Sequence, residues 1–224
     1  MKIKSCRTCK SNKLEPVYSL GQMSFTGIFP ISENSNVPKG ELKLVRCKKC
    51  TLLQLEDNFD PNLMYGKNYG YMSSLNKAME FHLKLKSRYL LKTYKLKRGN
   101  SILDIGSNDG TFLSFFKNTF NLYGCDPTIK KFKNYYRKDI KLIPDFFSVN
   151  KFKNQKFDLI TSIAIFYDLP DPLKFVNDIK QLLSENGIWH VEMSYMPSML
   201  NNSSYDTICH EHLEYYSLKS VKHI

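Results

Sequence analysis

Two histidines and a glutamate occupy three consecutive positions near the end of the sequence, at His210, Glu211 and His212. A core cannot bury such polar groups without giving them partners. Because histidine titrates near neutral pH and a neighbouring carboxylate tunes its basicity, the run is typical of a proton-transfer site. A buried, hydrogen-bonded cluster that closes a loop is the alternative interpretation.

Four of the six cysteines form two Cys-x-x-Cys pairs in the first 50 residues. Each pair can hold one edge of a tetrahedral ion, so the pattern predicts structural Zn²⁺ with no open coordination position and no chemistry of its own. A disulfide framework or a redox pair explains two such pairs less well. We expect strands near Leu14 to Leu20 and Leu42 to Cys47 between the pairs. The predicted ligands are Cys6, Cys9, Cys47 and Cys50.

A buried strand, a glycine turn and the start of a helix follow one another from Ser101 to Leu113. The glycines let a ligand approach the helix N-terminus, where free N–H groups favour a carboxylate or phosphate. Asp126 ends the next strand, and an acidic group there can bind two ribose hydroxyls. The candidate cofactor-binding residues of the turn are Asp104, Gly106, Ser107, Asn108 and Gly110.

Further strands are expected at Leu122 to Cys125, Phe157 to Ala164 and Gly187 to Met193, with helices between them. Alternating strands and helices predict an α/β fold with a parallel, doubly wound, Rossmann-like sheet. Its site would lie at the carboxyl ends of the strands.

The formal net charge is +12, yet only five of the 33 basic residues are arginine, the side chain favoured for bidentate phosphate and base contacts. The lysines are spread along the whole chain, so we expect attraction for anionic small molecules and no nucleic acid partner. No apolar run suits a membrane span or the core of a signal peptide, which predicts a cytoplasmic protein without membrane association. The sequence alone predicts no particular oligomeric state.

The glycine turn, the acidic strand end and the strand order resemble class I S-adenosylmethionine (SAM)-dependent methyltransferases. Three further features narrow the resemblance to the sugar C-methyltransferases: the four-cysteine module, the stretch Tyr69-Gly70-Tyr71-Met72-Ser73-Ser74, and the His-Glu-His run followed by Tyr215-Tyr216-Ser217. This family methylates a ring carbon of a nucleotide-linked 4-keto-deoxysugar. A generic nucleotide-binding Rossmann domain is the alternative for the glycine turn alone.

The resemblance implies roles for the reacting groups. A base removes a proton beside the ketone, and we assign it to His212, with His210 and Glu211 orienting it or relaying the proton. Tyr69 or Tyr71 would hydrogen-bond the enolate oxygen or the sugar diphosphate.

The resemblance also implies cofactor contacts. The methionine part of SAM would face the turn at Gly106, Ser107 and Gly110, and its ribose would face Asp126. Phe146 or Phe147 would contact the adenine, with plain core packing as the alternative for both rings.

Two positions depart from the family pattern, because Asp168 stands where relatives often carry histidine and Cys209 where they often carry tyrosine. A different acceptor sugar or O-methylation therefore stays open, and Cys209 also fits a small buried residue. An rRNA base methyltransferase and a non-enzymatic zinc interaction module are the remaining alternatives.

We divide the chain into a zinc-binding module (1–60), a helical linker with the tyrosine-serine stretch (61–98) and a SAM-binding core (99–224). The last residues, Leu218 to Ile224, look like the start of a helix that precedes the final hairpin of the class I sheet. We therefore expect a core that is truncated at its C-terminal end.

Overall fold

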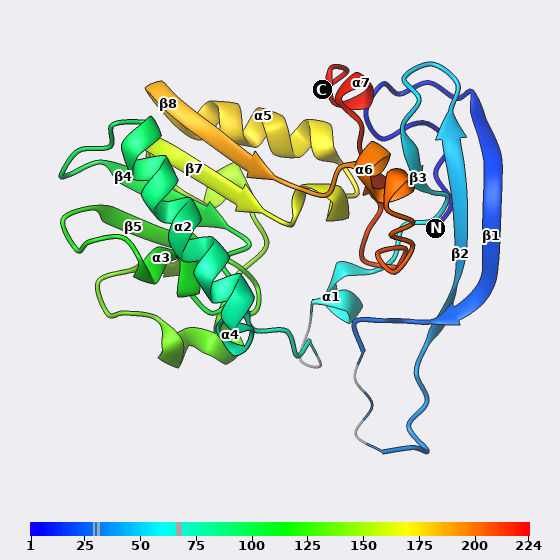
Figure 1. The fold of residues 1–224 in the computed structure, drawn as a ribbon, viewed down its shortest axis with the longest axis horizontal. Coiled ribbons are helices and arrows are strands. Elements are labelled where there is room, and N and C mark those ends of the chain that lie inside the picture. Colours follow the sequence, from blue (N-terminus) through cyan, green and yellow to red (C-terminus); the bar gives the residue numbers. More distant parts are fainter. Residues whose placement is uncertain (29, 31, 66–68) are drawn as a thin grey trace. The chain divides into compact units, whose positions relative to one another are not determined.

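The computed structural model describes residues 1–28, 30, 32–65 and 69–224, which form two compact units (Figure 1). The first unit comprises Met1–Gly70, Ala164–Val176 and Met193–Ile224, and the second comprises Tyr71–Ile163 and Asn177–Glu192. Both units are therefore assembled from segments that are distant in the sequence. No helix in the described part of the chain is long and apolar enough to cross a membrane.

The second unit contains a five-stranded sheet with the order β6-β5-β4-β7-β8, in which every neighbouring pair is parallel. The chain runs outward from β4 through β5 to β6 and then returns to β7, so the strand order reverses beside β4. Ligands bind at such a switch point in open α/β sheets. The strands are β4 (Ser101–Ile105), β5 (Asn121–Cys125), β6 (Lys141–Ile143), β7 (Phe157–Ile163) and β8 (Leu183–Glu192). The strands β4, β5, β7 and β8 confirm those expected from the sequence, whereas β6 was not predicted.

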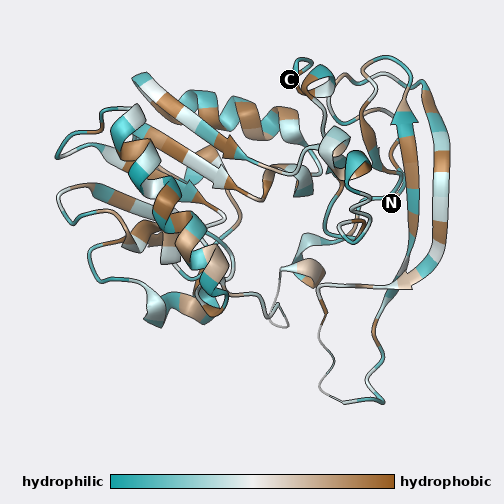
Figure 2. Ribbon diagram, in the orientation of Figure 1, coloured by the Kyte–Doolittle hydropathy of each residue, from teal (hydrophilic) through white to brown (hydrophobic). Residues whose placement is uncertain are grey.

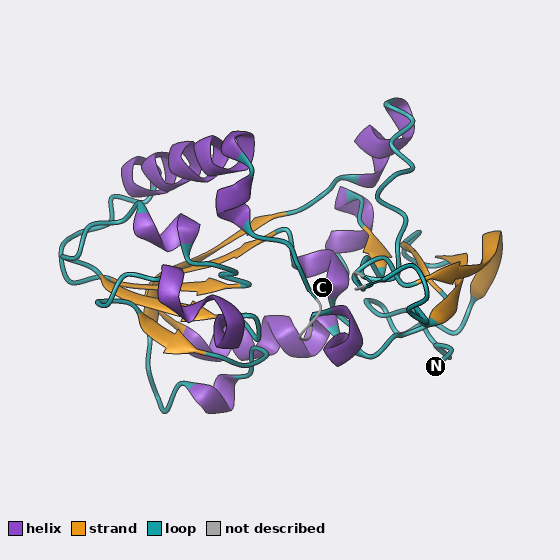
Figure 3. Cartoon of the chain, turned by 90° about the horizontal axis from the view of Figure 1, so that it is seen from below, coloured by secondary structure: helices purple, strands orange, loops and turns teal. Residues whose placement is uncertain are grey.

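Helices lie on both sides of the parallel sheet (Figure 3). The longest is α2 (Lys77–Thr93), where the Asn76 side chain accepts hydrogen bonds from the first backbone N–H groups, as an N-cap does. Its buried residues Leu83, Ser87 and Leu90 share one helical face, and both leucines join the core beneath the sheet. The other helices are α3 (Thr111–Ser114), α4 (Ile129–Phe132) and α5 (Pro172–Leu182).

The first unit contains a four-stranded antiparallel sheet with the order β1-β2-β3-β9. β1 (Leu14–Ser24) and β2 (Lys39–Cys47) contain the two strands expected between the cysteine pairs, which confirms that prediction. Hydrophobic and hydrophilic residues are interspersed along β1 (Figure 2). The remaining elements are β3 (Leu53–Leu55), α1 (Pro61–Met64), α6 (Met196–Asn201), β9 (Glu214–Tyr215) and α7 (Leu218–Val221).

The strand β9 comes from the far end of the chain and pairs with β3, in register Leu53 with Tyr215 and Gln54 with Glu214. Leu213 and Tyr215 are buried in a small core with Leu55. The His-Glu-His run directly precedes β9, so it belongs to the unit that carries the four cysteines.

Candidate functional site

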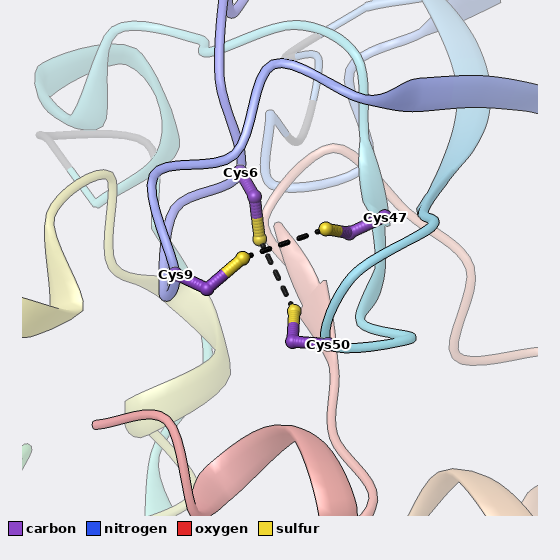
Figure 4. A group of neighbouring side chains, drawn as sticks. All are labelled: Cys6, Cys9, Cys47 and Cys50. Carbon is purple, nitrogen blue, oxygen red and sulfur yellow. Dashed lines mark hydrogen bonds between the residues drawn. The ribbon is translucent and has the colours of Figure 1, made fainter.

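The four paired cysteines converge at one point of the first unit (Figure 4). The sulfur atoms of Cys6 and Cys50 lie 3.5 Å apart, as do those of Cys9 and Cys47, and all four lie within 4.8 Å of one another. A tetrahedral zinc ion with bonds of about 2.3 Å needs sulfurs about 3.8 Å apart. The donor set and its spacing therefore fit one structural zinc ion, and four thiolates leave no position for a reacting molecule.

Both cysteine pairs use the same backbone turn. The backbone carbonyl of the first cysteine in each pair accepts a hydrogen bond from the N–H four residues later. The distance is 3.0 Å from the Lys10 N–H to the Cys6 carbonyl and 2.9 Å from the Thr51 N–H to the Cys47 carbonyl. Lys10 and Thr51 have positive φ values of 56° and 67°. This repeated turn directs both thiols of each pair toward the cluster.

The glycine turn after β4 has a left-handed backbone at three positions, with φ values of 77° at Gly106, 51° at Asn108 and 80° at Gly110. A Cβ atom at Gly110 would lie 2.6 Å from the ring of Tyr136. Glycine is therefore required at position 110 for two reasons, the backbone conformation and the lack of space.

Tyr136 locks this turn from a neighbouring segment. Its hydroxyl donates to the Asn108 carbonyl at 2.9 Å, so it accepts the proton of the Ser107 hydroxyl at 2.7 Å. Burial raises the pKa of Tyr136, which keeps the hydroxyl protonated. The Ser107 hydroxyl is thus hydrogen-bonded to Tyr136. Tyr136 was not predicted from the sequence, because it lies in a segment of lysine, asparagine and tyrosine that contains no motif.

The turn is tied to part of the tyrosine-serine stretch. The Asn108 side chain donates to the Tyr71 carbonyl at 3.1 Å and accepts from the Ser73 N–H at 3.0 Å. The Ser74 N–H donates to Asp109 at 3.0 Å. Asn108 and Asp109 therefore both connect the stretch to the turn by hydrogen bonds. Asp109 was not among the residues predicted from the sequence.

The two candidate tyrosines of the stretch fall in different units. Tyr71, in the second unit, is 42% exposed, so its side chain is accessible. Tyr69 belongs to the first unit, where its ring centroid lies 5.4 Å from that of Tyr65.

Asp126 follows β5 and is nearly buried beside the glycine turn. One carboxylate oxygen accepts from the N–H and the hydroxyl of Thr128 at 2.7 and 2.6 Å, and the other accepts from the Asn108 N–H at 2.9 Å. Since each oxygen can accept about two hydrogen bonds, Oδ2 has room for one more donor. Asp126 thus orients the turn and keeps one acceptor position for a ligand.

Asp104 lies at the end of β4 and is buried between strands. The Thr161 hydroxyl, from β7, donates to its Oδ1 at 2.7 Å. Burial raises the pKa of Asp104 to about 7, against the opposing effect of the Thr161 hydrogen bond. Asp104 therefore links two strands beneath the turn.

The two candidate adenine contacts follow β6 and differ in exposure. Phe146 is 38% exposed, whereas the Phe147 ring packs against Phe152 with centroids 5.8 Å apart. Of the two rings, Phe146 is the more accessible for stacking on a ligand.

His212 is held in one tautomer. Its Nδ1 lies 2.7 Å from the Thr207 carbonyl, which can only accept, so Nδ1 carries the proton and Nε2 carries the lone pair. The ring also contacts Tyr167 edge-on, with centroids 4.6 Å apart. Burial lowers the pKa of His212, against the raising effects of the Thr207 hydrogen bond and the Glu211 charge.

His210 has a different environment from His212. It is completely buried between the rings of Phe25 and Phe59, with centroid distances of 4.8 and 4.9 Å, and its Nε2 donates to the Gly40 carbonyl at 3.1 Å. This arrangement matches the structural alternative for that histidine.

Glu211 accepts a hydrogen bond from the Thr26 hydroxyl. The pKa of Asp168 lies well above its usual range, chiefly because the side chain is buried. The Tyr65 hydroxyl opposes this rise, and the Glu211 charge adds to it. Burial, followed by the Glu211 charge, also raises the pKa of Cys209 to about 12. Both positions that depart from the family pattern thus have a raised pKa, in part because of the Glu211 charge.

A family model described as "Methyltransferase domain" matches residues 76–224, well over half of the chain. The chain belongs to this methyltransferase family. A second model, described as "Putative zinc binding domain", matches residues 6–65, which contain all four clustered cysteines.

Among curated proteins, the C-methyltransferase NovU of Streptomyces niveus is 26% identical over 98% of this chain and 54% of its own length. The tRNA U34 carboxymethyltransferase of Campylobacter jejuni subsp. doylei is 29% identical over 48% of this chain and 41% of its own length. The chain therefore spans about half the length of the curated relatives it matches.

A solved complex between the Haloferax volcanii Trm112 methyltransferase activator and a methyltransferase contains a similar fold. The match has a TM-score of 0.54 and 15% identity, and it covers 67% of this chain and 72% of that one. Together these findings confirm a SAM-dependent methyltransferase fold with a parallel five-stranded sheet, preceded by an antiparallel module with a four-cysteine cluster.

Proposed function

We propose that this SAM-dependent methyltransferase methylates a ring carbon of a nucleotide-linked keto-deoxysugar. Bound SAM supplies an electrophilic methyl group, and the acceptor carbon must become nucleophilic by losing a proton beside the ketone. The similarity to the C-methyltransferase NovU over 98% of the chain supports carbon as the acceptor atom.

The single observation that carries the proposal is that His212, whose ring is partly exposed, is held in one tautomer. With its Nδ1 proton engaged by Thr207, the ring presents the Nε2 lone pair, and burial lowers its pKa, so the neutral form predominates at neutral pH. A neutral imidazole held in one orientation is suited to act as a general base. We assign proton removal to His212 Nε2, and we assign electrostatic support of the resulting imidazolium to Glu211.

The remaining roles follow from exposure and hydrogen-bonding capacity. We assign a ribose hydroxyl to Asp126 Oδ2, which has room for one donor, and the adenine to Phe146. The methionine part of SAM would lie against the backbone at Gly106 and Gly110. The exposed Tyr71 side chain is suited to hydrogen-bond the enolate oxygen or the diphosphate.

The test is proton exchange without methyl transfer. In heavy water, the full-length protein with S-adenosylhomocysteine should exchange the ring proton beside the ketone of a nucleotide-linked 4-keto-6-deoxysugar. His212→Asn should lower both exchange and methylation by about a hundredfold to ten-thousandfold, the usual cost of losing a general base. His223→Asn, the same change at an exposed histidine, is the matched control and should have no effect.

Three outcomes would change the proposal. If Glu211→Gln abolishes exchange while His212→Asn does not, Glu211 is the base. If neither change matters and a hydroxyl is methylated, the enzyme is an O-methyltransferase. An RNA substrate has less support, because the Campylobacter relative covers only 48% of the chain.

A further inference from the structure

Arg7 lies between the first two cysteines and is almost completely buried, with only 2% of its surface exposed. A buried guanidinium needs acceptors for its five N–H groups, so its partners reveal what it holds in place.

The guanidinium of Arg7 contacts two chain segments that are distant in the sequence. On the β3 side, it donates to the carbonyls of Leu55 at 2.8 Å and Asp57 at 3.1 Å, and to the Asn58 side chain at 2.6 Å. On the β9 side, it reaches the Leu213 carbonyl at 3.5 Å, and its Nε lies 3.5 Å from the Glu214 carboxylate.

The pairing that Arg7 bridges is short. β3 and β9 share only two residue pairs, extended by the Leu55 N–H donating to the Leu213 carbonyl at 2.9 Å. Glu214 is completely buried and faces the Arg7 charge. The ladder is only two residues long, so the Arg7 hydrogen bonds to the Leu55 and Leu213 carbonyls add to what keeps the segment in place.

The segment held by Arg7 begins directly after His212. The Leu213 N–H donates to the Tyr167 carbonyl at 2.8 Å, and the Tyr167 ring contacts His212. The backbone on the C-terminal side of His212 is thus contacted by Arg7 and hydrogen-bonded to Leu55 and Tyr167, while the His212 ring contacts Thr207 and Tyr167.

We propose that Arg7 is a positioning residue that couples the four-cysteine metal loop to the histidine base. Cys6 and Cys9 flank Arg7, so a metal ion that holds their thiolates also fixes the point from which the guanidinium reaches Leu213 and Glu214. The inference rests on the proposed function, since it concerns the base assigned there.

The test reads the position of His212 without any methyl transfer, so it is independent of the substrate experiment. In the full chain, hydrogen exchange of residues 207–216 and the ¹⁵N signals of histidine are measured with zinc bound, after zinc removal, and in Arg7→Lys. Lysine keeps the charge beside Glu214 but cannot bridge both carbonyls. Arg46→Lys, at an exposed ion pair of β2, is the matched control.

We expect zinc removal and Arg7→Lys each to speed exchange of residues 207–216 by about tenfold or more and to shift His212 away from the Nδ1-protonated tautomer. Arg7→Lys should keep its zinc, and residues 101–105 of the second unit should exchange as before. If either change leaves the exchange and the His212 signal unaltered, the coupling does not exist. An Arg7→Lys protein without zinc also overturns the proposal, because Arg7 would then support the metal loop alone.

Discussion

His210 and His212 are two residues apart and occupy opposite kinds of environment. His210 packs between two phenylalanine rings, whereas His212 has one nitrogen engaged by Thr207 and the other as the lone-pair site. His210 also has a fixed tautomer, since its Nε2 donates to the Gly40 carbonyl, but its Nδ1 is buried. Within the His-Glu-His run, only His212 combines a fixed tautomer with a partly exposed ring.

The lowered pKa of His212 predicts the pH dependence of the reaction. The unprotonated ring is the active form, so kcat/KM should rise with pH through the pKa of His212 and then stay level. Because burial lowers that pKa, the midpoint should lie below the ordinary histidine value of about 6.5. A pH–rate profile of the full-length enzyme measures it.

A midpoint above about 6.5 would show that protonation of another group, and not of His212, lowers kcat/KM at low pH. His223→Asn, at an exposed position, should leave the profile unchanged.

At the scale of elements, the glycine turn depends on partners from three segments. Tyr136 fills the space beside Gly110, Asp126 accepts from the Asn108 N–H, and Asn108 fastens Tyr71 and Ser73. The turn is therefore held in shape by the protein itself.

Gly110 and Gly99 provide a matched pair for testing this turn. Both have positive φ, 80° and 88°, but a Cβ at Gly110 would meet Tyr136 while a Cβ at Gly99 would meet nothing within 4 Å. Gly99→Ala should cost about 1–2 kcal/mol of unfolding free energy from backbone strain. Gly110→Ala should cost about 1–3 kcal/mol more from overpacking.

Chemical denaturation measures the unfolding free energies, and calorimetry measures SAM binding. Gly110→Ala should weaken SAM binding and Gly99→Ala should not. Equal losses of stability in both variants would show that Tyr136 moves aside without cost, and unchanged SAM affinity in Gly110→Ala would place the cofactor away from this turn.

At the scale of the whole molecule, the four-cysteine cluster and the candidate base belong to one compact unit, and the glycine turn belongs to the other. The first unit has a small core and a two-residue ladder between β3 and β9. Small cores commonly depend on a structural metal for part of their stability.

Removal of the metal should therefore affect one unit. Chelation, or Cys47→Ser, should speed hydrogen exchange across the first unit, including residues 193–224, and leave β4, β5 and β7 protected. Metal analysis of the purified protein should give one zinc ion per chain. A zinc content near zero with four free thiols would remove the basis of this prediction, and equal loosening of both units would contradict it.

Much of the fold could be predicted from local sequence. The Cys-x-x-Cys spacing, the buried strands Ser101–Ile105 and Phe157–Ile163, and the glycine turn each carry their signal within a few residues. Short-range patterns of this kind report hydrophobic burial and backbone freedom directly.

The pairing of β9 with β3 was decided by tertiary structure. A strand of two residues, Glu214–Tyr215, has no periodicity of its own, and its register depends on Arg7 and on a core built from the other end of the chain. The role of Tyr136 was also decided by tertiary structure, because its ring fills the space beside Gly110.

The sequence by itself determined which residues could do chemistry, because residue type and spacing set the possible ligands, acids and bases. Only the tertiary structure decided which histidine keeps an accessible nitrogen, because each ring has one nitrogen engaged by a carbonyl, but His210 is enclosed by Phe25 and Phe59 whereas His212 is partly exposed. Those contacts form only when distant segments pack together, so the identity of the candidate base is a property of the folded chain.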